Sequence, residues 1–274
     1  MEHHSGDLTH APLAYPGEPV AGPRLVLADC EHVVRPRLRL GASQSPWCAT
    51  CSGAGRPGAR RLLGAALDEL GAAPLAERTP VLAVGSNASA DVVRHKLASR
   101  GVPVVVPVLT GVVRGLGVAH SAHVSRAGYV PAAPVHRARA RTRVVLQLLD
   151  DDQLAAVDET EPTYERVELT ATRYPVVLSG GLRPSRVHVY AGRFGVVHLP
   201  GRAAERLLPQ HDILRALDRA GVPHTGGGPA AAARRLAASE DARVEARDAM
   251  RRLGLVRPHR LHHRPATTLR WRMP

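Results

Sequence analysis

The middle of the chain alternates between short apolar runs and segments with helical spacing. PVLAVGSNASA (residues 80–90) predicts a buried strand that ends at a small polar turn, and DVVRHKLASR behind it has the period of a helix. DDDQLAAVDETE predicts a second short helix, whose N-terminus is marked by acidic residues. This alternation predicts a mixed α/β domain over residues 80–199. Apolar runs that favour its further strands are VPVVVPV, TRVVLQLL, YERVELTATRY and SRVHVYAG.

The segments on either side of this domain have different patterns. Residues 1–23 are polar, rich in Pro and Gly and without periodicity, so we expect them to be disordered. Residues 24–58 contain every cysteine of the chain and predict a small compact module, and residues 59–79 predict a helix and a linker. Long helical patterns predict a helical extension over residues 200–254, and a basic tail follows over residues 255–274.

Composition narrows the class of protein. The 274 residues are 44% hydrophobic but include only one Phe, two Trp and five Tyr, so the core should consist of Val, Leu and Ala. No run approaches 18 uncharged apolar residues, so we expect no membrane span. The start MEHHSGDLTH lacks the basic and apolar regions of a secretory signal, and we therefore expect a cytoplasmic protein.

The net charge of +13 is compatible with nucleic-acid binding, although we do not favour that role. Lys96 is the single lysine, and an Arg-, Ala-, Gly- and Pro-rich chain is what the codon usage of a GC-rich genome produces. Residues 251–274 alone hold seven arginines and no acidic residue. Much of the excess charge therefore lies in one tail.

The cysteines suggest a metal site. Cys30, His32, Cys48 and Cys51 form the pattern C-x-H-x15-C-x2-C, which supplies two close pairs of ligands for tetrahedral zinc. Four protein ligands would fill the coordination sphere, so this zinc would be structural and would hold a zinc-ribbon-like module over residues 24–58. The alternatives are three reduced cysteines beside a surface histidine, or a redox pair formed by Cys48 and Cys51.

The order of the turn, the acidic helix and the strands resembles the gamma-glutamylcyclotransferase-like fold, a small, mostly-β barrel-like domain with flanking helices. In that family a strand ends in a Tyr-Gly-Ser-Asn turn, and a helix carries Leu-Asp-x-x-Glu shortly before a Tyr-x-Arg strand. The resemblance covers residues 80–192. The matching residues are Gly85, Ser86 and Asn87 in the turn, Val157, Asp158, Glu161, Tyr164 and Arg166 in the second signature, and Tyr190 in a late strand.

The resemblance implies that the N–H groups of the turn hold a gamma-glutamyl carboxylate and carbonyl. It also implies a Glu base that directs the substrate amine onto its own side-chain carbonyl and releases 5-oxoproline. This chain departs from the pattern, because Val84 replaces the tyrosine of the turn and the base position falls near Arg141. We therefore expect a catalytically altered relative that binds a small carboxylate-bearing or gamma-glutamyl-like ligand at the turn, near Arg141 and Tyr190.

Two alternatives stay open. The chain could be an active cyclotransferase or amide-cleaving enzyme with a displaced carboxylate, for which the candidates are Asp158, Glu161 and Glu165. Ion pairs that join helix and strand would also explain acidic residues at these positions. The chain could instead be an interaction or nucleic-acid module built on the zinc ribbon and the basic tail. The alternating arginines from Arg137 to Arg143 fit either a solvated strand edge or an anion site at the mouth of the pocket.

Overall fold

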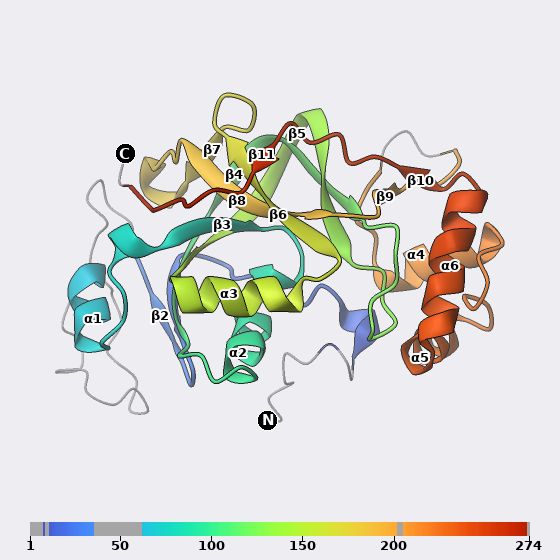
Figure 1. The fold of residues 1–274 in the computed structure, drawn as a ribbon, viewed down its shortest axis with the longest axis horizontal. Helices are drawn as coiled ribbons and strands as arrows, with labels where there is room; N and C mark the ends of the chain where they lie inside the picture. The colour runs from blue at the N-terminus through green and yellow to red at the C-terminus, as the bar shows by residue number, and fades with distance from the viewer. Residues whose placement is uncertain (1–7, 9–10, 36–61, 202–204, 273–274) are drawn as a thin grey trace.

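A large, mostly antiparallel sheet organises the chain (Figure 1). The computed structural model describes residues 8, 11–35, 62–201 and 205–272. Within them, nine strands form one sheet in the order β11-β6-β8-β3-β5-β4-β1-β2, and β7 pairs with β4. These strands are β1 Arg24–Leu27, β2 Glu31–Val33, β3 Thr79–Ala83, β4 Val105–His120, β5 Ala132–Leu149, β6 Tyr164–Thr170, β7 Val176–Leu178, β8 Arg186–Gly192 and β11 Arg264–Pro265. A second sheet pairs β9 (Val196–Val197) with β10 (Val256–Arg257).

Six α-helices accompany the sheet in the described part of the chain, which makes the fold mixed α/β as expected. In Figure 1, α2 and α3 lie beside β3, whereas α4, α5 and α6 gather at one end of the sheet. None of the described helices is long and apolar enough to cross a membrane. The helices are α1 Leu63–Glu69, α2 Ala90–Ala98, α3 Asp151–Thr160, α4 Gln210–Arg219, α5 Pro229–Ala238 and α6 Glu240–Arg252.

The predicted acidic start of α3 is confirmed. Asp150 is the N-cap, and its carboxylate accepts a hydrogen bond of 3.0 Å from the backbone N–H of Gln153. The backbone N–H of Asp150 donates in turn to Oε1 of Gln153 at 3.3 Å, which completes a capping box. The cap fixes where α3 begins directly after β5, and so sets the position of the residues at its far end.

The N-terminal segment differs from its predicted disorder. Residues 11–23 lie against the protein, and the Tyr15 side chain is only 5% exposed. The ring of Tyr15 stacks on Tyr129 with 4.2 Å between centroids, and Val20 N–H donates a 2.9 Å bond to the Ala88 carbonyl. These partners are distant in sequence, so the local composition of the segment gives no sign of them.

The C-terminal tail packs against the rest of the protein. It follows the sheet through β10 and β11 (Figure 1), and it buries Leu269 and Trp271. Thr79 Oγ1 donates a 2.8 Å bond to the Leu269 carbonyl, and Trp271 N–H donates a 2.6 Å bond to the Arg78 carbonyl. These two apolar side chains are two residues apart and have arginines as neighbours. They anchor an otherwise basic segment to the protein.

Gly111 of β4 lies in close contact with the backbone of β7. A Cβ at this position would meet the carbonyl oxygen of Val177 and would lie 2.8 Å from the Cα of Leu178. Both are backbone atoms of the paired strand, so neither can move without disturbing the sheet. We expect Gly111→Ala to lower the free energy of unfolding by about 1–3 kcal/mol in urea denaturation. Gly22→Ala, where no atom lies within 4 Å of the new Cβ, should leave it nearly unchanged; equal effects would contradict this packing.

Candidate functional site

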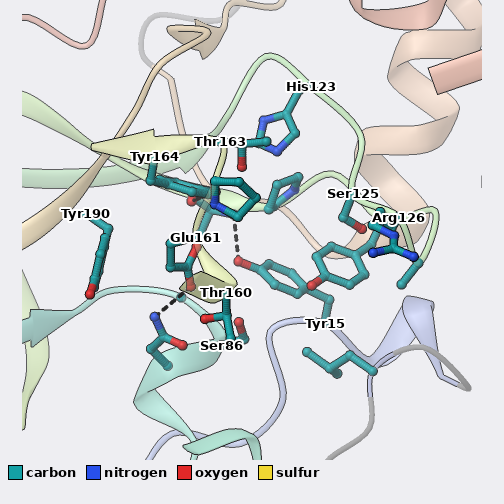
Figure 2. Close-up of a pocket in the computed structure, with 18 of the residues that line it drawn as sticks. Tyr15, Ser86, His123, Ser125, Arg126, Thr160, Glu161, Thr163, Tyr164 and Tyr190 are labelled. Carbon is teal, nitrogen blue, oxygen red and sulfur yellow. Dashed lines mark hydrogen bonds between the residues drawn. The ribbon is translucent and has the colours of Figure 1, made fainter. Parts of the chain in front are cut away.

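The Gly-Ser-Asn turn opens onto a pocket of about 460 Å³. β3 ends at Ala83, and the turn continues as a short 3-10 segment, Ser86–Ala88, before α2 begins. Figure 2 shows the lining side chains, which come from the N-terminal segment, the loop before β5, the end of α3 and β8. Helix α6 supplies a further wall. The pocket therefore joins segments from the whole length of the chain.

Gly85 is required by the close approach of Tyr15. A Cβ on Gly85 would lie 2.7 Å from the Tyr15 hydroxyl oxygen and 3.0 Å from the Cβ of Ala132. That hydroxyl oxygen accepts a 2.7 Å hydrogen bond from Ala132 N–H, which is at the start of β5. Among the described residues its own O–H has no acceptor, so it can donate to a ligand at the turn.

The Glu161 carboxylate also lies at the turn. Glu161, the C-cap of α3, accepts hydrogen bonds at Oε1 from Asn87 Nδ2 at 2.9 Å and from Lys96 Nζ at 2.6 Å. Lys96 Nζ also donates to Asn87 Oδ1 at 2.6 Å, which closes a three-membered network. The Glu161 and Lys96 side chains are 13% and 15% exposed. Oε2 of Glu161 has no hydrogen-bond partner in the described part of the chain and is available to a ligand.

Aromatic residues are concentrated around this network. Four of the five tyrosines and the single phenylalanine line the pocket. Tyr164 donates a 2.7 Å bond to the Ala132 carbonyl, and Tyr190 donates a 2.7 Å bond to Asp158 Oδ1. Burial raises the pKa of Tyr129 to about 12, and burial likewise raises the pKa of Tyr15, Tyr164 and Tyr190. All four are therefore neutral phenols at pH 7, and the pocket wall is apolar with hydroxyl donors.

The opposite wall is basic. Arg243 and Arg247 reach the pocket from α6, together with Glu240 of the same helix. The guanidinium of Arg247 lies 5.2 Å from the centroid of the Phe194 ring, and its Nε donates a 3.0 Å bond to Asp248 Oδ1, which leaves its other N–H groups for a ligand. Arg243 Nη1 is held by the carbonyls of Leu236 and Ala237, at 2.9 and 3.2 Å. This leaves its remaining donors for a ligand.

His123, in the loop between β4 and β5, also lines this pocket. Its Nδ1 lies 2.8 Å from Ser121 Oγ. Burial lowers the pKa of His123 to about 4, with a smaller contribution from Arg247, so the ring is neutral at pH 7.

The other two carboxylate candidates lie elsewhere. Asp158 is bound by the Arg166 guanidinium at 2.9–3.2 Å and by the Tyr190 hydroxyl, as an ion pair between helix and strand requires. Glu165 is exposed on β6 and lines a second hollow of about 360 Å³ with His259. Of the three, only Glu161 belongs to the pocket at the turn.

Arg141 is not brought to the turn. It is exposed in β5 opposite Arg114 of β4, and it is absent from the pocket lining. The physical reason is the length of β5, which begins at Ala132, well before the apolar run that the sequence marks as a strand. Ala132 and the loop before it, not Arg141, occupy the edge of the pocket.

The predicted zinc ligands are only partly within the described residues. Cys48 and Cys51 lie outside them, whereas Cys30 and His32 are at the β1–β2 hairpin with Sγ and Nε2 3.5 Å apart. Cys30 is disulfide-bonded in the structure. No cluster of three or more potential ligands occurs among the residues that the structure describes. The zinc ribbon and its two alternatives, reduced cysteines or a redox pair of Cys48 and Cys51, therefore stay predictions.

Metal analysis separates the zinc site from its alternatives. If the four residues form a zinc site, protein purified under reducing conditions should carry stoichiometric zinc, and Cys48→Ser should lose it. His211→Ala, which alters an exposed histidine on α4, should keep the metal. Absence of zinc from the protein purified under reducing conditions would contradict the zinc site.

Comparisons with known proteins give weak similarities. No family model matches the chain, and no curated protein matches it. A structure of a gamma-glutamyl cyclotransferase is 11% identical, with a TM-score of 0.35, over 69% of this chain and 94% of that one. A solution structure of a protein from Arabidopsis thaliana is 19% identical, with a TM-score of 0.31, over 42% of this chain and 62% of that one. Scores this low assign neither a fold nor an activity, so the functional argument rests on the pocket itself.

Proposed function

We propose that the pocket binds a small gamma-glutamyl-like ligand at the Gly-Ser-Asn turn, and that Glu161 acts there as a general base. The observation that carries this proposal is the 2.9 Å hydrogen bond between Glu161 and Asn87, inside the pocket that the turn lines. The two signatures on which the resemblance rests are far apart in sequence. Their meeting in one cavity supports a cyclotransferase-like arrangement.

The charges of the pocket complement such a ligand. A gamma-glutamyl group carries an ammonium and a carboxylate, and Glu161 offers an anionic oxygen for the first. Lys96, the Tyr15 hydroxyl and the N–H groups that begin a 3-10 turn offer donors for the second. Arg243 and Arg247 on the opposite wall suit a second carboxylate. The ligand class is therefore a gamma-glutamyl amino acid or peptide, in preference to a gamma-glutamyl amine.

The chemistry is an internal acyl transfer. The ligand's amine nitrogen attacks its gamma-carbonyl carbon, the new ring bond forms, and the bond to the departing amine breaks. The ammonium first loses one proton to solvent, which frees the nitrogen lone pair for the attack. Oε2 of Glu161 accepts the second proton as the ring bond forms and gives it to the leaving nitrogen, which departs as a neutral amine. Tyr15, a neutral phenol next to Gly85, is placed to donate to the carbonyl oxygen as negative charge develops on it.

A substrate panel tests this proposal. We expect purified protein to release 5-oxoproline from gamma-glutamyl amino acids and dipeptides, and more slowly from gamma-glutamyl alkylamines, which lack the second carboxylate. Calorimetry on the same panel measures binding separately. Binding without turnover would restrict the function to ligand recognition, the catalytically altered relative that the sequence suggested. Neither binding nor turnover with any compound would overturn the proposal.

A further inference from the structure

A cluster of exposed arginines lies in the middle of the β4–β5 hairpin, away from the pocket that the connecting loop of the hairpin lines. In Figure 1 this part of the hairpin lies near the top of the view, by the label β5. We call this cluster the hairpin arginine patch; its members are Arg114, Arg139, Arg141, Arg143 and Arg173, all exposed and none in the pocket lining.

Strand register brings the charges together. Arg114 and Arg141 are directly opposite each other, so their side chains project from the same face of the antiparallel pair. Arg143, two residues beyond Arg141, lies on that face too, because side chains alternate along a strand. The buried residues Val113 and Val144 occupy the other face. Arg173 is beside the hairpin, since its carbonyl would lie 3.2 Å from a Cβ on Gly115.

The patch has no internal counter-charge. In the described part of the chain, none of its five guanidiniums makes an ion pair or a side-chain hydrogen bond, whereas Arg78, Arg94 and Arg166 each bind carboxylates. The sequence from Val92 to Leu149, which includes both strands, contains no Asp or Glu. Like charges placed directly across a strand pair repel each other. An external anion with several charges, spaced along a surface, would remove this repulsion.

We propose that the hairpin arginine patch binds the phosphodiester backbone of a nucleic-acid duplex. Arginine is suited to this partner, because its planar fork of donors matches phosphate oxygens in pairs. A lipid surface is less suited: the large exposed apolar residues of the described chain are Val33, Leu62, Val244 and Leu253, and none is on the hairpin to enter a bilayer.

Fluorescence anisotropy with short labelled DNA and RNA duplexes tests this surface. The full-length protein should bind at low salt, with an affinity that falls steeply as KCl rises. The triple variant Arg139→Gln/Arg141→Gln/Arg143→Gln should bind at least about tenfold more weakly, and its salt slope should be smaller by about 0.9 for each phosphate that the variant can no longer neutralise. These residues are exposed and outside the pocket, so calorimetry with gamma-glutamyl compounds should be unchanged.

A second triple variant controls for total charge. Arg215→Gln/Arg219→Gln/Arg234→Gln removes the same charge from exposed positions on α4 and α5, and it should retain most of the affinity. Equal decreases in affinity in the two variants would overturn the proposal, because binding would then follow net charge alone. Failure of the parent protein to bind either duplex would also overturn it, as would binding to vesicles of anionic lipid without binding to the duplexes.

Discussion

Glu161→Gln should lower kcat/KM for 5-oxoproline release by about 10²–10⁴-fold, the usual contribution of a general base. The amide keeps the shape of the side chain and still presents an oxygen to Asn87 and Lys96, so the turn should stay folded. What disappears is an oxygen that can accept the proton of the attacking amine. Ligand affinity should fall less than the rate, because the donors for the ligand carboxylate are untouched.

Glu165→Gln is the matched control for this prediction. It makes the same chemical change four residues away, at an exposed position of β6 outside the pocket. This variant should keep kcat/KM within about twofold of the parent, because an exposed charge contributes little to the energetics of a folded protein. A rate decrease in Glu165→Gln comparable to that in Glu161→Gln would mean that general loss of negative charge, and not proton transfer at the turn, limits the reaction. Full activity in Glu161→Gln would remove Glu161 from catalysis.

The parts of the site that could be predicted are those with a local signature. The break of an apolar strand at Gly85 fixes the turn, and the acidic cap of α3 fixes where Glu161 falls at the other end of that helix. Tyr190 is predicted from the family resemblance, as the tyrosine of a late strand, and it lines the pocket from β8. Each of these positions is set by the element that carries it, so a short stretch of sequence contains the necessary information.

The parts that could not be predicted depend on contacts between distant segments. Tyr15 lies in a Pro- and Gly-rich stretch, and only its packing on Tyr129 and Gly85 makes it part of the pocket. Arg243 and Arg247 belong to α6, whose sequence pattern predicts an amphipathic helix. The pattern does not say where that helix packs, and so does not place the two arginines at the pocket. The prediction for Arg141 is wrong for a different reason: the exposed, arginine-rich part of β5 lacks the apolar residues by which a buried strand is recognised.

Arg78→Met should destabilise the protein by about 3–5 kcal/mol, the cost of removing one partner from a buried charged network. The Arg78 side chain is 0% exposed, and Nε donates a 2.8 Å bond to the Ala73 carbonyl. Nη1 lies 3.0–3.2 Å from acceptors in three further places: the carbonyls of Val105 and Leu148, and Oε1 of Gln153. Methionine fills much of the volume but donates nothing, so these buried acceptors would be left without this donor.

Loss of the Arg78 side chain should affect several elements at once, because this residue contacts several of them. Its side chain joins the linker before β3 to β4, β5 and α3, and Nη2 lies 3.6 Å from the Asp150 carboxylate that caps α3. Its carbonyl accepts the N–H of Trp271, which holds the C-terminal tail against the sheet. Burial lowers the pKa of Arg78, and the nearby Asp150 carboxylate partly opposes this effect. A guanidinium nevertheless stays charged at neutral pH. The surrounding acceptors therefore stabilise a buried positive charge.

Urea unfolding followed by circular dichroism measures this prediction, with Arg100→Met as the matched control. Arg100 makes a 3.1 Å ion pair with Glu159 in which the side chains are 30% and 70% exposed, so its removal should cost less than about 1 kcal/mol. Arg78→Lys should lie nearer to Arg78→Met than to the parent, because an ammonium retains the charge but cannot reach acceptors on several sides at once. If Arg78→Met changed the free energy of unfolding no more than Arg100→Met does, the buried network would not be what fixes β3, α3 and the tail together.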